Sequence, residues 1–281
     1  MRMAIQLISL AVVAALVSGG ASAADALYKG RIFDAHVHYS AHSWDVYTPE
    51  AAITMLDKQD VFGALVSSTP DEGTRRLAAV EQARVRVVPL FRPYHDSSDL
   101  SLWYANSDRL SESERAITGG HRDGLGEVHI HSPKALDGER IQNLVRQIAK
   151  AGLLIQPHAG FAVVERLFEI APDIKIVWAH AGFSDPPSVI GRLMDKHKQL
   201  WADLSYREDG IIGANGLNDE WKALLVRHAD RFMVGSDTWE ADRWYAYPGI
   251  IEANRRWLGQ LPQDAADKIA HGNAEQLFGL R

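Results

Sequence analysis

The sequence predicts a single (β/α)₈ barrel, and three observations support this fold class. Short apolar runs alternate with longer amphipathic segments along most of the 281 residues, which is the pattern of repeated βα units. Eight such runs occur, and several are almost continuously apolar, as strands buried on both faces of a parallel sheet are. About 258 residues follow the N-terminal leader of residues 1–23, and a barrel of this type typically has about 250. A doubly wound open sheet is the alternative arrangement of the same elements.

The eight predicted strands each end near a polar or small residue. Their ranges are 31–38, 61–67, 85–91, 124–130, 153–158, 174–180, 200–204 and 231–235.

Helix signals lie between the predicted strands. Thr48, Pro49 and Glu50 supply an N-cap, a proline in the first turn and an early acid. Two later segments repeat the helical spacing of apolar residues, at Ile141, Leu144, Val145 and Ile148 and again at Val164, Leu167, Phe168 and Ala171.

The longest stretch without periodicity spans residues 92–121, after the third predicted strand. Long loops in compact domains are commonly functional, and after a barrel strand such a loop would cover the face where active sites lie. The alternative is an insertion without a role. Five aromatic residues suggest an aromatic-lined mouth, or simple packing at the rim: Trp44, Tyr47, Trp103, Trp239 and Trp244.

Residues 1–23 resemble a secretory leader rather than part of the fold. Arg2 precedes an apolar run of about 15 residues, which is short for a membrane span of about 20, and Ala21-Ser22-Ala23 forms a small-x-small cleavage site. An uncleaved anchor is the alternative. We therefore expect an exported protein, periplasmic or secreted, whose mature domain spans residues 24–281 and does not associate with a membrane.

Composition narrows the chemistry and the partners. The chain has no cysteine, so a lipid-modified N-terminus and a thiolate are excluded and any metal must be held by nitrogen and oxygen ligands. The net charge of −6 becomes −7 without Arg2, which argues against nucleic acid or an anionic membrane as a partner. A small-molecule substrate is expected, and a homo-oligomer is compatible with the sequence.

Polar residues gather where the predicted strands end. His36 and His38 are two apart in the first strand, so they should share a face and hold one cation, with Asp34 behind them. Glu127, His158, His180 and Asp237 occupy the ends of the fourth, fifth, sixth and eighth strands, and His129 and His131 follow Glu127. Strand ends of a barrel converge on one face, so these side chains predict one metal-binding, catalytic site.

Several motifs together resemble the amidohydrolase superfamily, and most closely its amidohydrolase-related (type 2) family. They are Asp34-Ala35-His36-Val37-His38, Gly126-Glu127, Pro157-His158, Ala179-His180-Ala181-Gly182, Asp203-Leu204-Ser205, Gly235-Ser236-Asp237-Thr238 and the tail at 269–278. The resemblance implies a distorted barrel and a divalent metal, often zinc. His36, His38, His158 and Asp237 would be its ligands and His180 would lie near the reacting group. Many two-metal members have a bridging carboxylated lysine on strand four, where this chain has Glu127, so the resemblance leaves one or two ions open.

The ligand chemistry predicts hydrolysis of an amide, ester or lactone. A divalent metal lowers the pKa of bound water from 15.7 toward about 7, Asp237 would accept the proton, and His180 would bind the carbonyl or the developing oxyanion. Arg92 and Arg207 follow the third and seventh strands and are candidates for pairing with a substrate carboxylate. Non-oxidative decarboxylation on the same ligands and a metal-binding relative without activity are the alternatives.

The leader generates the first prediction. In the native host, the mature protein should begin at Ala24, because the cleavage site ends at Ala23. Intact-mass measurement of the purified protein tests this, and a mature species that still begins at Met1 would contradict it.

Overall fold

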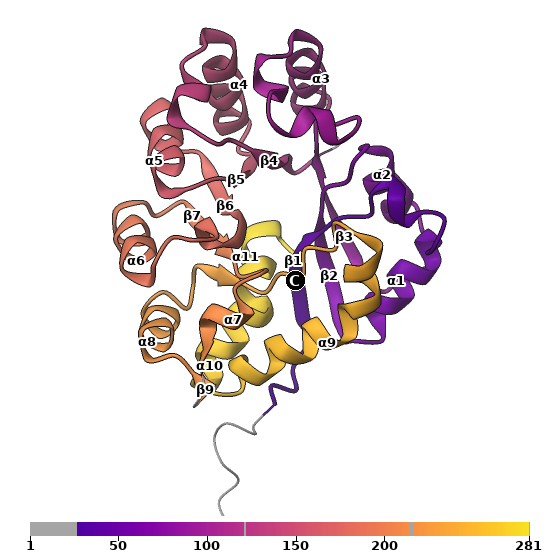
Figure 1. Ribbon diagram of the computed structural model, residues 1–281, viewed down its shortest axis with the longest axis vertical. Coiled ribbons are helices and arrows are strands. Elements are labelled where there is room, and N and C mark those ends of the chain that lie inside the picture. Colours follow the sequence, from indigo (N-terminus) through magenta and orange to yellow (C-terminus); the bar gives the residue numbers. More distant parts are fainter. Residues whose placement is uncertain (1–26, 121, 214–215, 281) are drawn as a thin grey trace, which may run out of the picture.

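Eight parallel strands form one sheet in the order β1, β2, β3, β4, β5, β6, β7, β10, and Figure 1 shows them as a ring with helices outside. The computed structural model describes residues 27–120, 122–213 and 216–280, so the predicted leader lies outside the described residues. The amide of Ala35 in β1 donates to the carbonyl of Val234, just after β10, at 2.8 Å, which joins the first strand to the last. The sheet is thus a nearly closed (β/α)₈ barrel in one domain, and the open-sheet alternative is excluded. The strands are β1 (Ile32–Val37), β2 (Val61–Val66), β3 (Arg86–Phe91), β4 (Gly124–His129), β5 (Leu154–His158), β6 (Lys175–Trp178), β7 (Leu200–Asp203) and β10 (Phe232–Met233).

The helices cover the outside of the ring and one end of it. The α-helices are α1 (Pro49–Asp57), α2 (Glu72–Ala78), α3 (Ser107–Thr118), α4 (Glu139–Lys150), α5 (Phe161–Ile170), α6 (Pro187–Lys196), α7 (Glu208–Ile211), α8 (Asp219–Arg227), α9 (Ala241–Leu258), α10 (Gln263–Asp267) and α11 (Asn273–Phe278). Short 3₁₀ turns are η2 (Ala41–Ser43), η3 (Ser97–Leu100), η4 (Trp103–Ala105), η5 (Pro133–Leu136) and η6 (Ala179–Gly182), and η7 (Lys268–Gly272) is a π-helix.

The predicted helix signals are confirmed. The Thr48 hydroxyl accepts a hydrogen bond from the amide of Ala51 at 3.2 Å and caps α1. All four stripe residues of α4 are buried. In α5 the same holds for Val164, Leu167 and Phe168.

The prediction of an irregular stretch over 92–121 is wrong, because twelve of its residues form α3. Few apolar residues of α3 face the core, namely Leu110 and Ile117, so its periodicity is weak. The N-terminal end is nonetheless well specified, since the Asn106 side chain accepts from the amides of Asp108 and Arg109. The hairpin of β8 (Ile212–Gly213) and β9 (Gly216–Leu217) was also not predicted.

Strand β1 departs from the regular alternation of faces. Phe33 and Ala35 pack inside the barrel with Leu65, Val177 and other apolar residues, and the pairing with β2 shifts between Asp34 and Val37. The expectation that Asp34 lies behind the histidine rings is wrong. Asp34 instead accepts from the Tyr247 hydroxyl of α9 at 3.0 Å and from the amides of His36 and Ser236, and burial raises its pKa to about 6.

The C-terminal helix covers the amino-terminal end of the barrel. The ring of Phe278 in α11 stacks on Phe33 with centroids 5.4 Å apart, and Glu275 pairs with Arg31 at 2.6 Å. In Figure 1, α11 lies near the centre of the ring. Within the described residues, no helix is both long and apolar enough to cross a membrane.

Helix α9 ties the start of the domain to the barrel through Arg255. Its guanidinium donates to the carbonyls of Tyr28 and Gly30, before β1, and of Gln59, before β2. Burial lowers the pKa of Arg255. One side chain therefore holds two chain segments at the amino-terminal ends of neighbouring strands.

Replacement of Arg255 by Gln should lower the free energy of unfolding by about 2–4 kcal/mol, because a half-buried charged donor serves three carbonyls. Urea denaturation monitored by circular dichroism measures this. Arg256→Gln is the matched control: Arg256 is exposed and pairs with exposed Glu252, and surface changes of this kind stay within about 0.5 kcal/mol. Equal losses in both variants would contradict the role given to Arg255.

Candidate metal centre

The polar residues that end the strands converge at the carboxyl end of the barrel. His36 and His38 lie at the end of β1, Glu127 on β4, His158 on β5 and Asp237 after β10. All are buried except His158, whose side chain is 33% exposed. The arrangement brings five titratable groups predicted from the sequence into one cluster.

The imidazoles of His36 and His38 face each other with their Nε2 atoms 3.1 Å apart. The other nitrogen of each ring is a donor, because His36 Nδ1 lies 3.1 Å from Asp203 Oδ2 and His38 Nδ1 contacts the Ser67 carbonyl. Both Nε2 atoms therefore present lone pairs to the same space. Two lone pairs at this distance repel unless a cation or a proton lies between them.

Asp237 completes a set of three donors. Its Oδ1 lies 3.2 Å from His38 Nε2 and 3.7 Å from His36 Nε2. Ligand atoms that bond one ion at about 2.0–2.2 Å lie roughly 2.8–3.6 Å apart when their bonds are about 90–110° from each other. Two of the three separations fall in this range and the third lies just beyond it.

The carboxylate of Asp237 supports the same conclusion. Its Oδ1 is buried and has no hydrogen-bond partner within the described part of the chain, and a buried carboxylate oxygen without a partner is costly. Burial would raise the pKa of Asp237, but His36 and His38 hold it below its ordinary value. The three residues fit a divalent cation, whose bond to Oδ1 would satisfy this atom.

Glu127 lies between this set and a second one. Its Oε1 is 2.7 Å from His158 Nδ1, 3.3 Å from His180 Nε2 and 3.7 Å from His36 Nε2. Its Oε2 is 3.4 Å from His38 Nε2. Burial would raise the pKa of Glu127, but His36 and hydrogen bonds to His158 and His180 hold it well below its ordinary value. An ionised carboxylate in this position can contact cations on both sides.

His180 is held on its Nδ1 side by Ser205 and Asp203 at the end of β7. Its Nδ1 lies 2.8 Å from the Ser205 hydroxyl, and that hydroxyl donates to Asp203 Oδ1 at 2.6 Å. Nδ1 is therefore the donor, and Nε2 turns toward Glu127 and His158, whose Nδ1 is 3.2 Å away. Burial would lower the pKa of His180, but its hydrogen bond to Glu127 raises it. His180 can thus act as a ligand when neutral or as a donor when protonated.

Asp203 positions both His36 and His180, a role that its motif in the sequence does not by itself indicate. Oδ2 accepts from His36 Nδ1 and from Gln156 Nε2 at 3.2 Å, whereas Oδ1 accepts from the amides of His180 and Ser205. A carboxylate behind a ligand histidine fixes its tautomer and strengthens it as a donor to metal. Asp203 ends strand β7, as the other site residues end their strands, and this position is the feature of the sequence that could have identified it.

His129 is a further residue of the cluster. Its ring stacks on that of His158 with centroids 4.3 Å apart, and with Glu127 and His158 it forms a third group of potential ligands. Its Nδ1 is 3.3 Å from the Tyr94 hydroxyl, which accepts from the His129 amide at 2.7 Å. Burial lowers the pKa of His129 to about 3, so the ring is neutral. His131 contacts the His129 ring but belongs to none of these groups.

The two arginines predicted to bind substrate have different positions. Arg92 is buried and donates to the Glu127 carbonyl at 3.0 Å and to Glu127 Oε2 at 2.9 Å. Arg207 lies outside the cluster, with its guanidinium on the Trp221 ring and bonded to the carbonyls of Phe183 and Asp185. Arg92 thus fixes a site residue, whereas Arg207 holds the loop after β6.

A cavity of about 570 Å³ opens over the cluster. Glu127, His129, His158 and Asp237 contribute to its wall, together with Trp239. Trp239 alone of the five predicted mouth aromatics lines this cavity. Trp103 and Trp244 are fully buried, so their role is packing.

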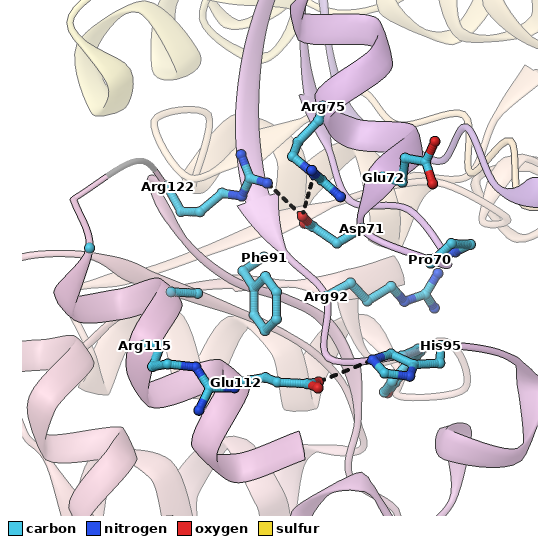
Figure 2. A pocket seen from close by; sticks show the side chains of 13 residues that line it. Pro70, Asp71, Glu72, Arg75, Phe91, Arg92, His95, Glu112, Arg115 and Arg122 are labelled. Atoms are coloured by element: carbon cyan, nitrogen blue, oxygen red, sulfur yellow. Dashed lines mark hydrogen bonds and ion pairs between the residues drawn. The ribbon is translucent and has the colours of Figure 1, made fainter. Parts of the chain in front are cut away.

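A second cavity of about 650 Å³ adjoins the first, and Arg92 and His95 line both. Figure 2 shows Arg75 and Arg122 directed at Asp71 on one side of this cavity, and their nitrogens lie 3.5 and 2.6 Å from Asp71 Oδ2. Arg75 and Arg122 are thus paired with an acid that lines the same cavity. Arg92 reaches from this cavity to the metal cluster.

Fold and site together define a barrel protein with a metal-binding cluster at the carboxyl ends of its strands. The amidohydrolase family model matches residues 16–280. The chain therefore belongs to the amidohydrolase family, as its motifs imply. A comparison with curated proteins finds no match.

Solved structures similar to this one share its fold at low sequence identity. A probable 2-pyrone-4,6-dicarboxylic acid hydrolase from Acinetobacter baumannii is 15% identical, with a TM-score of 0.58 over 89% of this chain and 99% of that one. A zinc-bound amidohydrolase from Burkholderia multivorans is 14% identical, with a TM-score of 0.58 over 89% and 99%. A manganese-bound dihydroxybenzoic acid decarboxylase from a Polaromonas species is 12% identical, with a TM-score of 0.56 over 90% and 98%. The fold thus accommodates both hydrolases and decarboxylases.

The position of Glu127 between two donor sets generates a prediction on stoichiometry. Apo-protein titrated with zinc should bind two equivalents, and Glu127→Gln should bind one, because a neutral amide cannot join two cations. Isothermal titration calorimetry measures both, with Glu112→Gln, an acid of the outer cavity, as the control. One equivalent bound by the parent would reject the bridge and leave His180 as a catalytic group.

Proposed function

We propose that this protein is a metal-dependent hydrolase that acts on an amide, ester or lactone of a small molecule. The observation that carries the proposal is the buried Oδ1 of Asp237, which has no hydrogen-bond partner among the described residues and lies opposite two imidazole nitrogens that both present lone pairs. When bound, a divalent cation lowers the pKa of a water molecule toward about 7 and polarises a carbonyl oxygen.

His36, His38 and Asp237 would hold the principal ion, with His158 joining them if only one ion is bound. Imidazole nitrogen and carboxylate oxygen suit zinc, whereas manganese and magnesium favour oxygen-rich sites. We therefore propose zinc. If two ions are bound, Glu127 would join them and His158 and His180 would hold the second.

Asp237 is proposed as the proton acceptor. Its lowered pKa keeps the carboxylate ionised at neutral pH, and Oδ2, which is not directed at His38, lies 3.8 Å from His180 Nε2. A proton taken from the attacking water by Oδ2 would pass to the leaving group. General-base steps of this kind contribute typically about 10²–10⁴-fold in rate.

His180 is proposed to stabilise the carbonyl oxygen as negative charge develops on it. Because Nδ1 donates to Ser205, the Nε2 side is the one available to substrate, and the raised pKa of His180 favours the protonated ring in which Nε2 is also a donor. Donors prepared in this way are worth roughly 3–4 kcal/mol in comparable sites. This role holds in the one-ion case, in which His180 is not a ligand.

Substrate size and location complete the proposal. A cavity of about 570 Å³ admits a small molecule rather than a polymer, and the leader at residues 1–23 supports action outside the cytoplasm. Decarboxylation has support only from the fold that both reactions share. Hydrolysis is preferred because Asp237 lies beside His36 and His38, where it could accept the proton of the attacking water.

Chelation of the metal should abolish hydrolysis of an ester, lactone and amide panel while the far-ultraviolet circular dichroism stays unchanged, because the barrel core does not include the ligands.

Asp237→Asn should reduce kcat by about 10²-fold or more. Asp242→Asn, in the first turn of α9, is the control and should retain the parent rate. Activity of Asp237→Asn within about threefold of the parent would contradict the assignment.

A further inference from the structure

Three aromatic side chains form a half-exposed wall beside the metal cluster. Phe183 follows η6, Tyr206 follows β7 and Trp239 follows β10. Phe183 is 53% exposed and Trp239 is 45% exposed. These three residues are called the aromatic wall below.

The aromatic wall is continuous with the site at both ends. The Phe183 ring lies 6.2 Å from that of His158 and 5.6 Å from that of His180, centroid to centroid. It lies 6.3 Å from the ring of Tyr206, whose hydroxyl accepts from the Trp239 indole at 2.7 Å. Because His158 and Trp239 both line the metal-site cavity, the wall extends that cavity outward.

The backbone that carries the wall is strained. Phe183 and Tyr206 have left-handed φ angles of 55° and 57°, which are unfavourable for bulky residues. His180 and Ala181 are also left-handed, at 56° and 47°. Such conformations cost energy and persist only where the surroundings enforce them, commonly at functional sites.

Specific contacts enforce this conformation. The Arg207 guanidinium donates to the carbonyls of Phe183 and Asp185, and Asp185 Oδ2 accepts from the amide of Phe161 at 3.0 Å. The Arg243 guanidinium covers the Tyr206 ring at 3.9 Å. These contacts therefore hold the exposed apolar ring of Phe183 at the surface beside His158 and His180.

The segment after β3 lines the same cavity mainly with polar side chains. They are Arg92, His95, Asp96 and Ser97, and Leu100 of this segment is the apolar exception. A ligand in the cavity therefore meets Trp239 of the aromatic wall as well as these polar groups.

We propose that the aromatic wall is a binding site for an apolar alkyl or aryl group that flanks the reacting carbonyl of the substrate. This inference rests on the proposed function, since it assigns the substrate class of the same site. Phe183 is the specificity-determining residue, because its ring contacts two histidines of the cluster and its side chain remains accessible. Arg207 is a positioning residue that acts through the Phe183 backbone.

The test measures binding rather than turnover. Acetohydroxamate and benzohydroxamate both offer a metal-directed group but differ in their apolar part. Calorimetry on the zinc-loaded protein should give benzohydroxamate an affinity about tenfold higher, the effect expected for an added apolar group in a hydrophobic pocket. Phe183→Ala should abolish most of this preference and leave the affinity for acetohydroxamate unchanged.

Two further variants separate the wall from general damage. Phe183→Leu keeps an apolar side chain and should retain most of the preference. Phe161→Ala removes a ring that is 42% exposed on the neighbouring loop, keeps the backbone amide that binds Asp185, and should behave as the parent. Thermal unfolding of each variant confirms that it is folded.

Each result bears on the proposal. An unchanged preference in Phe183→Ala, or equal affinity of the parent for both hydroxamates, would overturn the aromatic wall and leave the metal centre intact. Binding of neither hydroxamate would overturn the metal centre itself, and the wall's role with it.

Discussion

The close approach of His36 and His38 is the constraint on which the rest of the site depends. Each ring donates a hydrogen bond from Nδ1 to a protein acceptor, so the two Nε2 atoms point their lone pairs into one small space. Asp203, Asp237 and Glu127 surround them with negative charge, which is why the pKa of His36 rises well above its ordinary value although burial alone would lower it. A buried set of this composition needs positive charge inside it, which either a bound cation or a proton on an imidazole can supply.

This grouping of charges requires several strand ends to lie close together. The ends of β1, β4, β5 and β7 must approach one another closely, and small residues permit this. A Cβ on Gly235 would lie 3.0 Å from Asp203 Oδ1 and 3.2 Å from the Cβ of His36, and one on Gly126 would lie 2.6 Å from the Cβ of Gln156. The two glycines therefore allow carboxylates and imidazoles from separate strands to occupy one pocket.

Much of the fold, and the convergence of the polar side chains at one end of the barrel, could be predicted from the sequence, because apolar runs that end in His, Glu or Asp indicate both a strand and its site-facing end. The directions of individual side chains could not be predicted. The register shift in β1 turned Asp34 toward α9, and no periodic pattern reveals such a shift. Arg207 resembled a substrate anchor by position, but its guanidinium reaches backbone carbonyls of another loop, a contact between segments that sequence spacing does not encode. Asp203 lies at the end of β7, the same position along a strand as the other site residues, and this position alone does not reveal its contacts with His36 and His180.

Stability and chemistry occupy opposite ends of this barrel. The amino-terminal end is closed by α11 and secured by Arg255, far along the strands from every residue of the metal cluster. Loops at the carboxyl end can therefore be exchanged without disturbing what holds the barrel shut. For an engineer, the chain is a scaffold in which the loop residues beyond Arg92 and beyond His180 can be diversified to recruit new substrates, while those two site residues and the floor of the barrel are kept constant.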